Sequence, residues 1–120
     1  MKEIVIPILN DEYKTVFTYG TPEEIKKVLK KYYYPMDQVH EEHFEGRGVC
    51  FYHPGCYPIM AMPGFPKTAE EMGTLAHEAV HAVNNIFEKI GEDGCGEVFA
   101  HSVSAIVEKV LTEGKKKKWK

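Results

Sequence analysis

Two histidines four residues apart, His77 and His81, stand on either side of a glutamate, Glu78, that directly follows the first of them. On a helix, side chains at this spacing lie one turn apart on the same side. Two imidazoles so placed can bind one zinc ion, and the glutamate can hold the zinc-bound water for hydrolysis. The H-E-x-x-H pattern therefore predicts a metal site. The alternative is a solvent-exposed polar helix face that binds no metal.

A helix that carries this pattern is predicted from its own boundaries. Thr68 and Glu71 form a capping box that begins it, and Gly91 ends it after about Ile90. With about 100° of rotation per residue, the apolar residues of 72–90 gather on the side opposite the histidines. The predicted metal-binding face thus has a core-forming face behind it.

A catalytic zinc site needs a third protein ligand and an open position for water. A second helix is predicted over roughly 96–112, and its polar side carries Glu97 and His101 one turn apart. If the glycine-rich turn before it folds this helix back on the first, the pair can meet His77 and His81. Either Glu97 or His101 could then complete the site.

The two stretches "GTLAHEAVHAVNNIFEKIG" and "GEVFAHSVSAIVEKV" resemble the minimal gluzincins, the short stand-alone metallopeptidases of bacteria and their phages. The resemblance covers roughly residues 57–111. It implies a zincin-like fold and a zinc-dependent peptidase activity. By position, the implied site residues are His77, His81 and Glu97 as zinc ligands and Glu78 as the general base.

Two departures from the family pattern leave the third ligand open. Only 15 residues separate His81 from Glu97, and His101 stands where the family has an aromatic or acidic residue. His101 is therefore an alternative zinc ligand, a partner that supports a ligand, or a donor to the developing oxyanion. The other oxyanion candidates are His53 and Tyr57.

Cysteines offer a second possible metal site. Cys50, His53 and Cys56 are spaced three residues apart, and Cys95 could join them around a structural zinc ion. A β-hairpin with buried thiols would give the same spacing. The three cysteines are an odd number in what is expected to be a reducing compartment, which argues against a disulfide framework.

The remaining elements are predicted to form a small sheet early in the chain. Residues 3–9 and 13–19 are rich in β-branched and aromatic residues and predict a hairpin, with Pro7 favouring an edge position for its first strand. Thr21 and Pro22 begin a helix over 21–34.

Two further strands, "RGVCFYH" and "YPIMAMP", follow this helix. The second resembles the edge strand along which zincins bind an extended peptide. The fold class is therefore predicted as α+β, with a small early sheet, one N-terminal helix and two long C-terminal helices that carry the metal site. A single domain over 1–114 precedes a basic tail, 115–120, that is expected to be disordered.

Length and charge limit the possible partners. At 120 residues and 43% hydrophobic composition, the chain is ordinary for one globular domain. Its net charge is −3, and because five lysines fall in residues 115–120, the preceding part carries −8. No specific nucleic-acid partner is expected for so acidic a body. The N-terminal apolar stretch is too short for a signal peptide or a membrane span, so a cytoplasmic location is expected.

The sequence therefore predicts a peptidase that holds one Zn²⁺ and hydrolyses a peptide or protein substrate through water activated by Glu78. The alternative is a non-catalytic binding or regulatory module, in which the same zinc site only stabilises a small fold.

Overall fold

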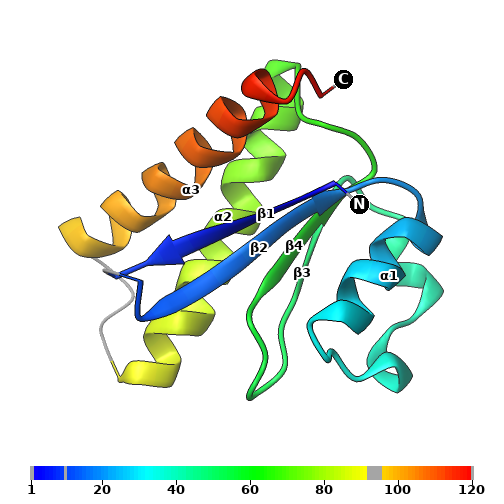
Figure 1. The fold of residues 1–120 in the computed structure, drawn as a ribbon. Helices are drawn as coiled ribbons and strands as arrows, with labels where there is room; N and C mark the ends of the chain where they lie inside the picture. Colours follow the sequence, from blue (N-terminus) through cyan, green and yellow to red (C-terminus); the bar gives the residue numbers. More distant parts are fainter. Residues whose placement is uncertain (1, 10, 92–95, 120) are drawn as a thin grey trace.

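The computed structural model describes residues 2–9, 11–91 and 96–119. Over these residues the chain is an α+β fold, in which a four-stranded mixed sheet is packed between helices (Figure 1). The elements follow in the order β1 (Glu3–Ile8), β2 (Tyr13–Tyr19), α1 (Pro22–Lys31), two short 3₁₀ helices (Met36–Gln38 and Glu41–Phe44), β3 (Val49–Phe51), β4 (Ile59–Met62), α2 (Ala69–Ile90) and α3 (Glu97–Lys116).

The strand order in the sheet is β1-β2-β4-β3. The predicted hairpin is confirmed, because β1 and β2 pair antiparallel, and β1 with Pro7 lies at an edge. β2 pairs parallel with β4, and β3 pairs antiparallel with β4. The prediction that "YPIMAMP" supplies the edge strand is wrong, because β4 lies between β2 and β3. The second edge is β3.

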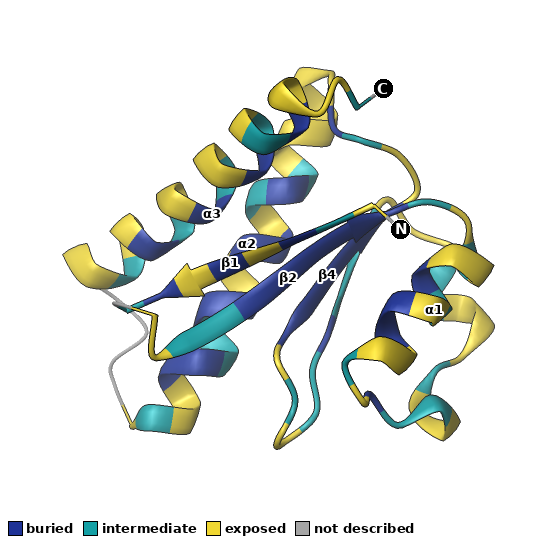
Figure 2. Cartoon of the chain, in the orientation of Figure 1, coloured by how far each residue is buried: buried dark blue, intermediate teal, exposed yellow. Residues whose placement is uncertain are grey.

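The helices cover the two faces of the sheet unequally. Ile25, Val28 and Leu29 of α1 pack on one face. The other face carries α2 and α3, and Ile4, Ile6 and Ile8 of β1 belong to the core beneath them. Because successive strand residues point to opposite faces, Val5 between them remains exposed. Buried residues therefore line both sides of the sheet, while the outer sides of the helices are exposed (Figure 2).

The predicted start of α1 and both predicted ends of α2 are confirmed, whereas α1 ends at Lys31 and not at residue 34 as predicted. The side chains of Thr21 and Thr68 each accept a hydrogen bond from the backbone N–H three residues on. The side chains of Glu24 and Glu71 each accept one from the backbone N–H of the capping threonine. Gly91 ends α2 with φ 75°, a left-handed conformation that favours glycine. These local signals fix where the helix that carries the two histidines begins and ends.

The basic tail differs from its prediction as a disordered end. α3 continues to Lys116, and the ring of Trp119 lies 5.3 Å from that of Tyr19 and 5.9 Å from that of Phe65. Phe65 also packs against Gly114, where a β-carbon would stand 2.1 Å from its Cζ. A single aromatic residue among the lysines therefore holds the end of α3 against β2 and the segment before α2.

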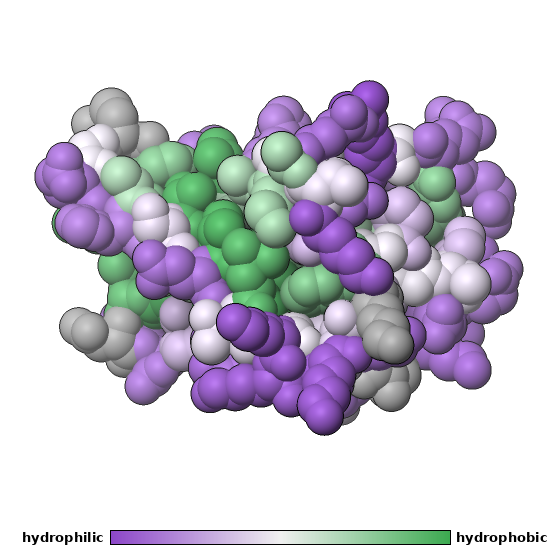
Figure 3. Space-filling model, turned by 90° about the horizontal axis from the view of Figure 1, so that it is seen from above, coloured by the Kyte–Doolittle hydropathy of each residue, from purple (hydrophilic) through white to green (hydrophobic). Residues whose placement is uncertain are grey.

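The long helices leave some apolar surface. Met72 and Val80 of α2 and Val98 of α3 are exposed, and hydrophobic residues reach the surface between hydrophilic ones in the view from above (Figure 3). None of the helices in the described ranges is both long and apolar enough to cross a membrane.

Candidate metal and hydrolytic site

The two histidines of the H-E-x-x-H pattern lie together on the exposed side of α2. Their Nε2 atoms are 3.2 Å apart, and their ring centroids are 4.8 Å apart. Both side chains are exposed, whereas the next turns of the same helix bury Leu75, Ala79 and Ala82 in the core. The predicted separation of a polar face from an apolar face is therefore confirmed for this helix.

The separation of the two Nε2 atoms is that of a hydrogen bond between the imidazoles, and it is also compatible with two ligands of one zinc ion. Two histidine nitrogens at about 2.0–2.1 Å from a tetrahedral zinc ion lie about 3.3 Å from each other. The observed 3.2 Å between the Nε2 atoms of His77 and His81 is close to that value. Neutral imidazole is also a common ligand for zinc. These two residues therefore fit two of the positions around the metal.

Glu78 differs from the histidines beside it, because it is buried, with 6% of its surface exposed. Burial raises the pKa of its carboxyl group, and the electrostatic interaction with His77 and His81 opposes this shift. The helix turns Glu78 towards β3, where Gly48 allows the backbone to come close. A β-carbon on Gly48 would stand 3.4 Å from Oε2 of Glu78.

An open cleft of about 410 Å³ runs beside this carboxylate. Its lining comes from α2 and from the residues that lead into β3: Arg47, Gly48, Glu70, Gly73, Thr74, His77 and Glu78. Across it, Nη1 of Arg47 lies 2.8 Å from Oε1 of Glu70. The cleft therefore lies between α2 and the segment that leads into β3, which is an edge strand of the sheet.

The two candidate third ligands lie together on α3. Nε2 of His101 is 3.5 Å from Oε2 of Glu97, and both side chains are more than four-fifths exposed. In residues 2–9, 11–91 and 96–119, no three His, Cys, Asp or Glu side chains form a group that could hold a metal ion. The structure therefore brings together the pair on α2 and the pair on α3, but not one pair with the other.

The remaining predicted groups lie away from the cleft. Nδ1 of His53 is 3.0 Å from the carbonyl oxygen of Pro54, and Tyr57 lines a different pocket with Cys56. As oxyanion donors, His53 and Tyr57 are thus not among the residues that line the cleft.

The thiols of Cys50 and Cys56 are free, and Cys95 lies outside the described residues. Burial, followed by the nearby carboxylate of Glu78, raises the pKa of Cys50 to about 12. Its thiol is therefore protonated at neutral pH.

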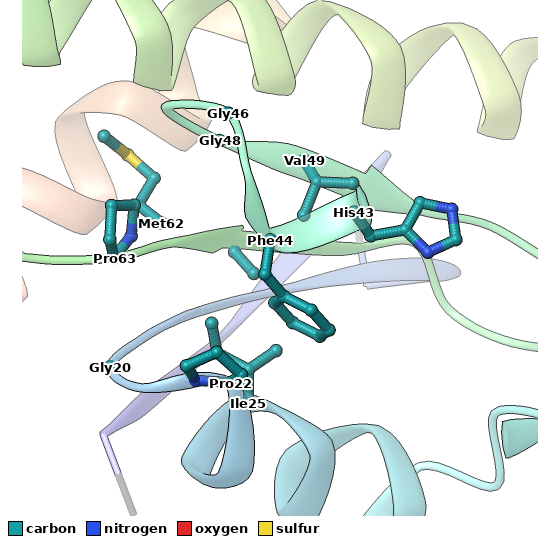
Figure 4. Close-up of a pocket in the computed structure, with 11 residues that line it drawn as sticks. Gly20, Pro22, Ile25, His43, Phe44, Gly46, Gly48, Val49, Met62 and Pro63 are labelled. Carbon is teal, nitrogen blue, oxygen red and sulfur yellow. The ribbon is translucent and has the colours of Figure 1, made fainter. Parts of the chain in front are cut away.

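A second pocket lies on the α1 side of the sheet. The ring of Phe44 points towards Pro22 and Ile25, and the pocket is bounded above by Gly46 and Gly48 (Figure 4). Its volume of about 40 Å³ is enough for only one or two water molecules. It is therefore too small to be the binding site for a peptide.

The sequence analysis singled out only His77 and Glu78 of the residues that line the cleft, and of those it missed, Arg47 and Gly48 lie outside α2. Both lie in the segment before β3, and they reach the cleft through the long-range packing of β3 on α2. A sequence signal existed in the "GRG" at 46–48, since paired glycines mark a place where backbone approaches another element closely. That signal does not name the element approached.

Comparison with protein-family models, with curated proteins and with solved structures finds no match to this chain.

Proposed function

We propose that this protein is a zinc-dependent peptidase with a zincin-like fold. The observation that carries the proposal is the 3.2 Å separation of the Nε2 atoms of His77 and His81, next to the buried carboxylate of Glu78 and an open cleft. In this proposal the two histidines hold one Zn²⁺. Glu97 is the third ligand, with His101 as the alternative, and either would have to approach the histidines, because the two pairs lie apart in the structure.

Zinc, when bound here, would supply Lewis-acid chemistry: it lowers the pKa of water and polarises a carbonyl group. Glu78 then has the role of general base. Its carboxylate, which lines the open cleft together with His77, would accept the proton of the attacking water and pass it to the leaving amine.

The substrate class follows from the sheet edge. An extended peptide can donate and accept main-chain hydrogen bonds at a free strand edge, and β3 is the edge strand beside α2. Main-chain pairing does not depend on side chains, so it suits a peptide or protein substrate. The cleft would hold the peptide between β3 and α2, with its carbonyl group near His77 and Glu78.

The test compares the wild type with Glu78→Gln and His77→Ala. All three proteins are measured for bound zinc by atomic emission and for cleavage of a random peptide mixture by mass spectrometry. We expect Glu78→Gln to retain one zinc ion and lose cleavage by at least about a hundredfold, because general-base catalysis contributes 10²–10⁴-fold. His77→Ala should lose both. A wild type that binds zinc but cleaves no peptide or protein would contradict the peptidase proposal and favour a non-catalytic metal-binding module.

A further inference from the structure

The lining of the cleft beside Glu78 includes one positively charged side chain, that of Arg47. Arg47 is the only arginine in the sequence, and in the cleft lining it is accompanied by the carboxylates of Glu70 and Glu78. It belongs to the segment that leads into β3, so it stands on the wall opposite α2. Its guanidinium group is paired with Glu70 at 2.8 Å, but its side chain remains 72% exposed.

The position of Arg47 along the cleft can be related to the position of Glu78. Glu70 and Glu78 are eight residues apart on α2, which at 1.5 Å per residue places them about 12 Å apart along the helix axis. An extended chain advances about 3.3 Å per residue. A group that binds Arg47 next to Glu70 would therefore lie about three to four residues from the peptide bond held at Glu78.

The direction of β3 relates Arg47 to one end of a bound peptide. The strand runs from Val49, two residues after Arg47, to Phe51. β3 already pairs antiparallel with β4, and antiparallel pairing is the more common arrangement of neighbouring strands. A peptide added antiparallel to β3 would run the opposite way, so its C-terminal part would lie beside Arg47.

On the basis of the peptidase function proposed above, we propose that Arg47 is a specificity residue that binds a carboxylate of the substrate, C-terminal to the bond that is cleaved. Guanidinium matches a carboxylate with two parallel hydrogen bonds, which lysine cannot provide. The carboxylate is either the free C-terminus of the substrate or an Asp or Glu side chain.

Glu70 occupies Arg47 when no such substrate is bound. Its side chain is 64% exposed, and an ion pair between two exposed side chains is weak and readily exchanged. Because the body of the protein is acidic, a carboxylate elsewhere on the peptide would be repelled. Arg47 thus gives a preference for one position of the acidic group on the peptide. The substrate carboxylate must compete with the Glu70 carboxylate for the guanidinium group.

The binding test uses the zinc-loaded Glu78→Gln protein, which can bind a peptide without cleaving it. Fluorescence anisotropy measures its affinity for short labelled peptides that are neutral apart from one carboxylate, at the C-terminus or on a single Asp side chain, and for the fully amidated equivalent. We expect about tenfold tighter binding of one carboxylate peptide over the amide, a gap that corresponds to one charge-assisted contact. The two carboxylate peptides distinguish the two sources.

Three second substitutions in this background test the assignment. Arg47→Gln should abolish the preference, Arg47→Lys should retain only part of it, and Glu70→Gln should strengthen it by freeing the guanidinium group. Lys89→Gln, on the exposed C-terminal turn of α2 away from the cleft lining, is the charge-matched control and should leave the preference unchanged. An unchanged preference in Arg47→Gln, or no binding of any carboxylate peptide, would overturn the role of Arg47.

Cleavage by the wild type separates this inference from the peptidase proposal. If carboxylate binding depends on Arg47 but nothing is cleaved, the peptidase function fails and Arg47 remains a carboxylate-recognition residue. If peptides are cleaved with no preference for a carboxylate, the function stands and the inference is overturned. If the preferred carboxylate lies N-terminal to the cleaved bond, the assigned direction of the substrate is overturned.

Discussion

Gly48 packs so closely against Glu78 that a β-carbon at position 48 would stand 3.3 Å from Cγ and 3.4 Å from Oε2 of the glutamate. The same β-carbon would stand 2.9 Å from Cγ2 of Thr74. Any side chain at this position must therefore displace the wall of α2 that carries the proposed general base. The glycine is a positioning residue, since it acts through the placement of another side chain.

The first prediction is that Gly48→Ala lowers both peptide cleavage and stability. We expect kcat/KM to fall about tenfold, because a small displacement of a catalytic group is costly, and the free energy of unfolding to fall by about 1–2 kcal/mol through overpacking. Steady-state kinetics and urea denaturation measure the two effects. Gly46→Ala is the matched control, because the nearest atom to its β-carbon is 3.8 Å away. Equal losses in the two variants would contradict a positioning role for Gly48.

A second prediction concerns removal of the metal. A third ligand on α3 would join this helix to α2 through the zinc ion, but the two helices already pack on each other in the core, where the rings of Phe87 and Phe99 are 5.4 Å apart. α2 is already held by its capping box and by buried residues such as Leu75 and Val83. The chelated protein should therefore keep its far-ultraviolet circular dichroism spectrum and a cooperative thermal transition. Unfolding on chelation would favour the structural-zinc module over the peptidase.

The third prediction distinguishes the two candidate ligands on α3. Glu97→Ala should weaken zinc binding by at least about tenfold, because loss of a carboxylate ligand removes both a bond and a negative charge. His101→Ala should have a smaller effect. Competition with a fluorescent chelator measures both dissociation constants. The reverse ranking would make His101 the third ligand, and no change in either variant would place the third ligand elsewhere.

The fourth prediction is a pH dependence of stability that arises at Glu3. Burial pushes the pKa of its carboxyl upwards, but hydrogen bonds from Lys31 and Tyr32 and the charge of Lys31 hold it below the usual value. A lowered folded-state pKa stabilises the protein above the unfolded-state pKa, near 4.5, and this contribution is lost as the pH falls.

The variant Glu3→Gln should therefore be less stable than the wild type by about 1 kcal/mol at pH 7, and the difference should vanish below about pH 3. Urea denaturation across this pH range measures it. Glu41→Gln is the control. The side chain of Glu41 pairs with Lys26 but is 81% exposed, and such a pair contributes little to stability. An equal loss of stability at pH 7 and at pH 3 would mean that packing, rather than charge, gives Glu3 its effect.

Local signals predicted the helices well. The capping boxes at Thr21 and Thr68 and the glycine at Gly91 depend on residues within one turn of each other, so they can be recognised without knowledge of the fold. The two faces of α2 follow from helical periodicity in the same way. The position of His77 beside His81 was therefore predictable.

Strand order was less accessible from the sequence. All four residues of β4 are buried, so its apolar run carries no alternation to distinguish a central strand from an edge strand. β4 pairs with β2 across more than 40 residues, and a contact at that separation leaves no local pattern. The approach of Gly48 to Glu78 depends on the same tertiary arrangement. Trp119 was missed because the lysines around it dominate the composition of the tail.

The packing of Phe65 on Gly114 has a consequence for the other end of α3. A helix of 20 residues is about 30 Å long, so a tilt of about 10° around the packed end moves the opposite end by about 5 Å. Glu97 lies at that opposite end, where α3 is packed on α2 through the rings of Phe87 and Phe99, 5.4 Å apart. A methyl group added at position 114 would therefore either displace Phe65 or strain this second contact between α2 and α3.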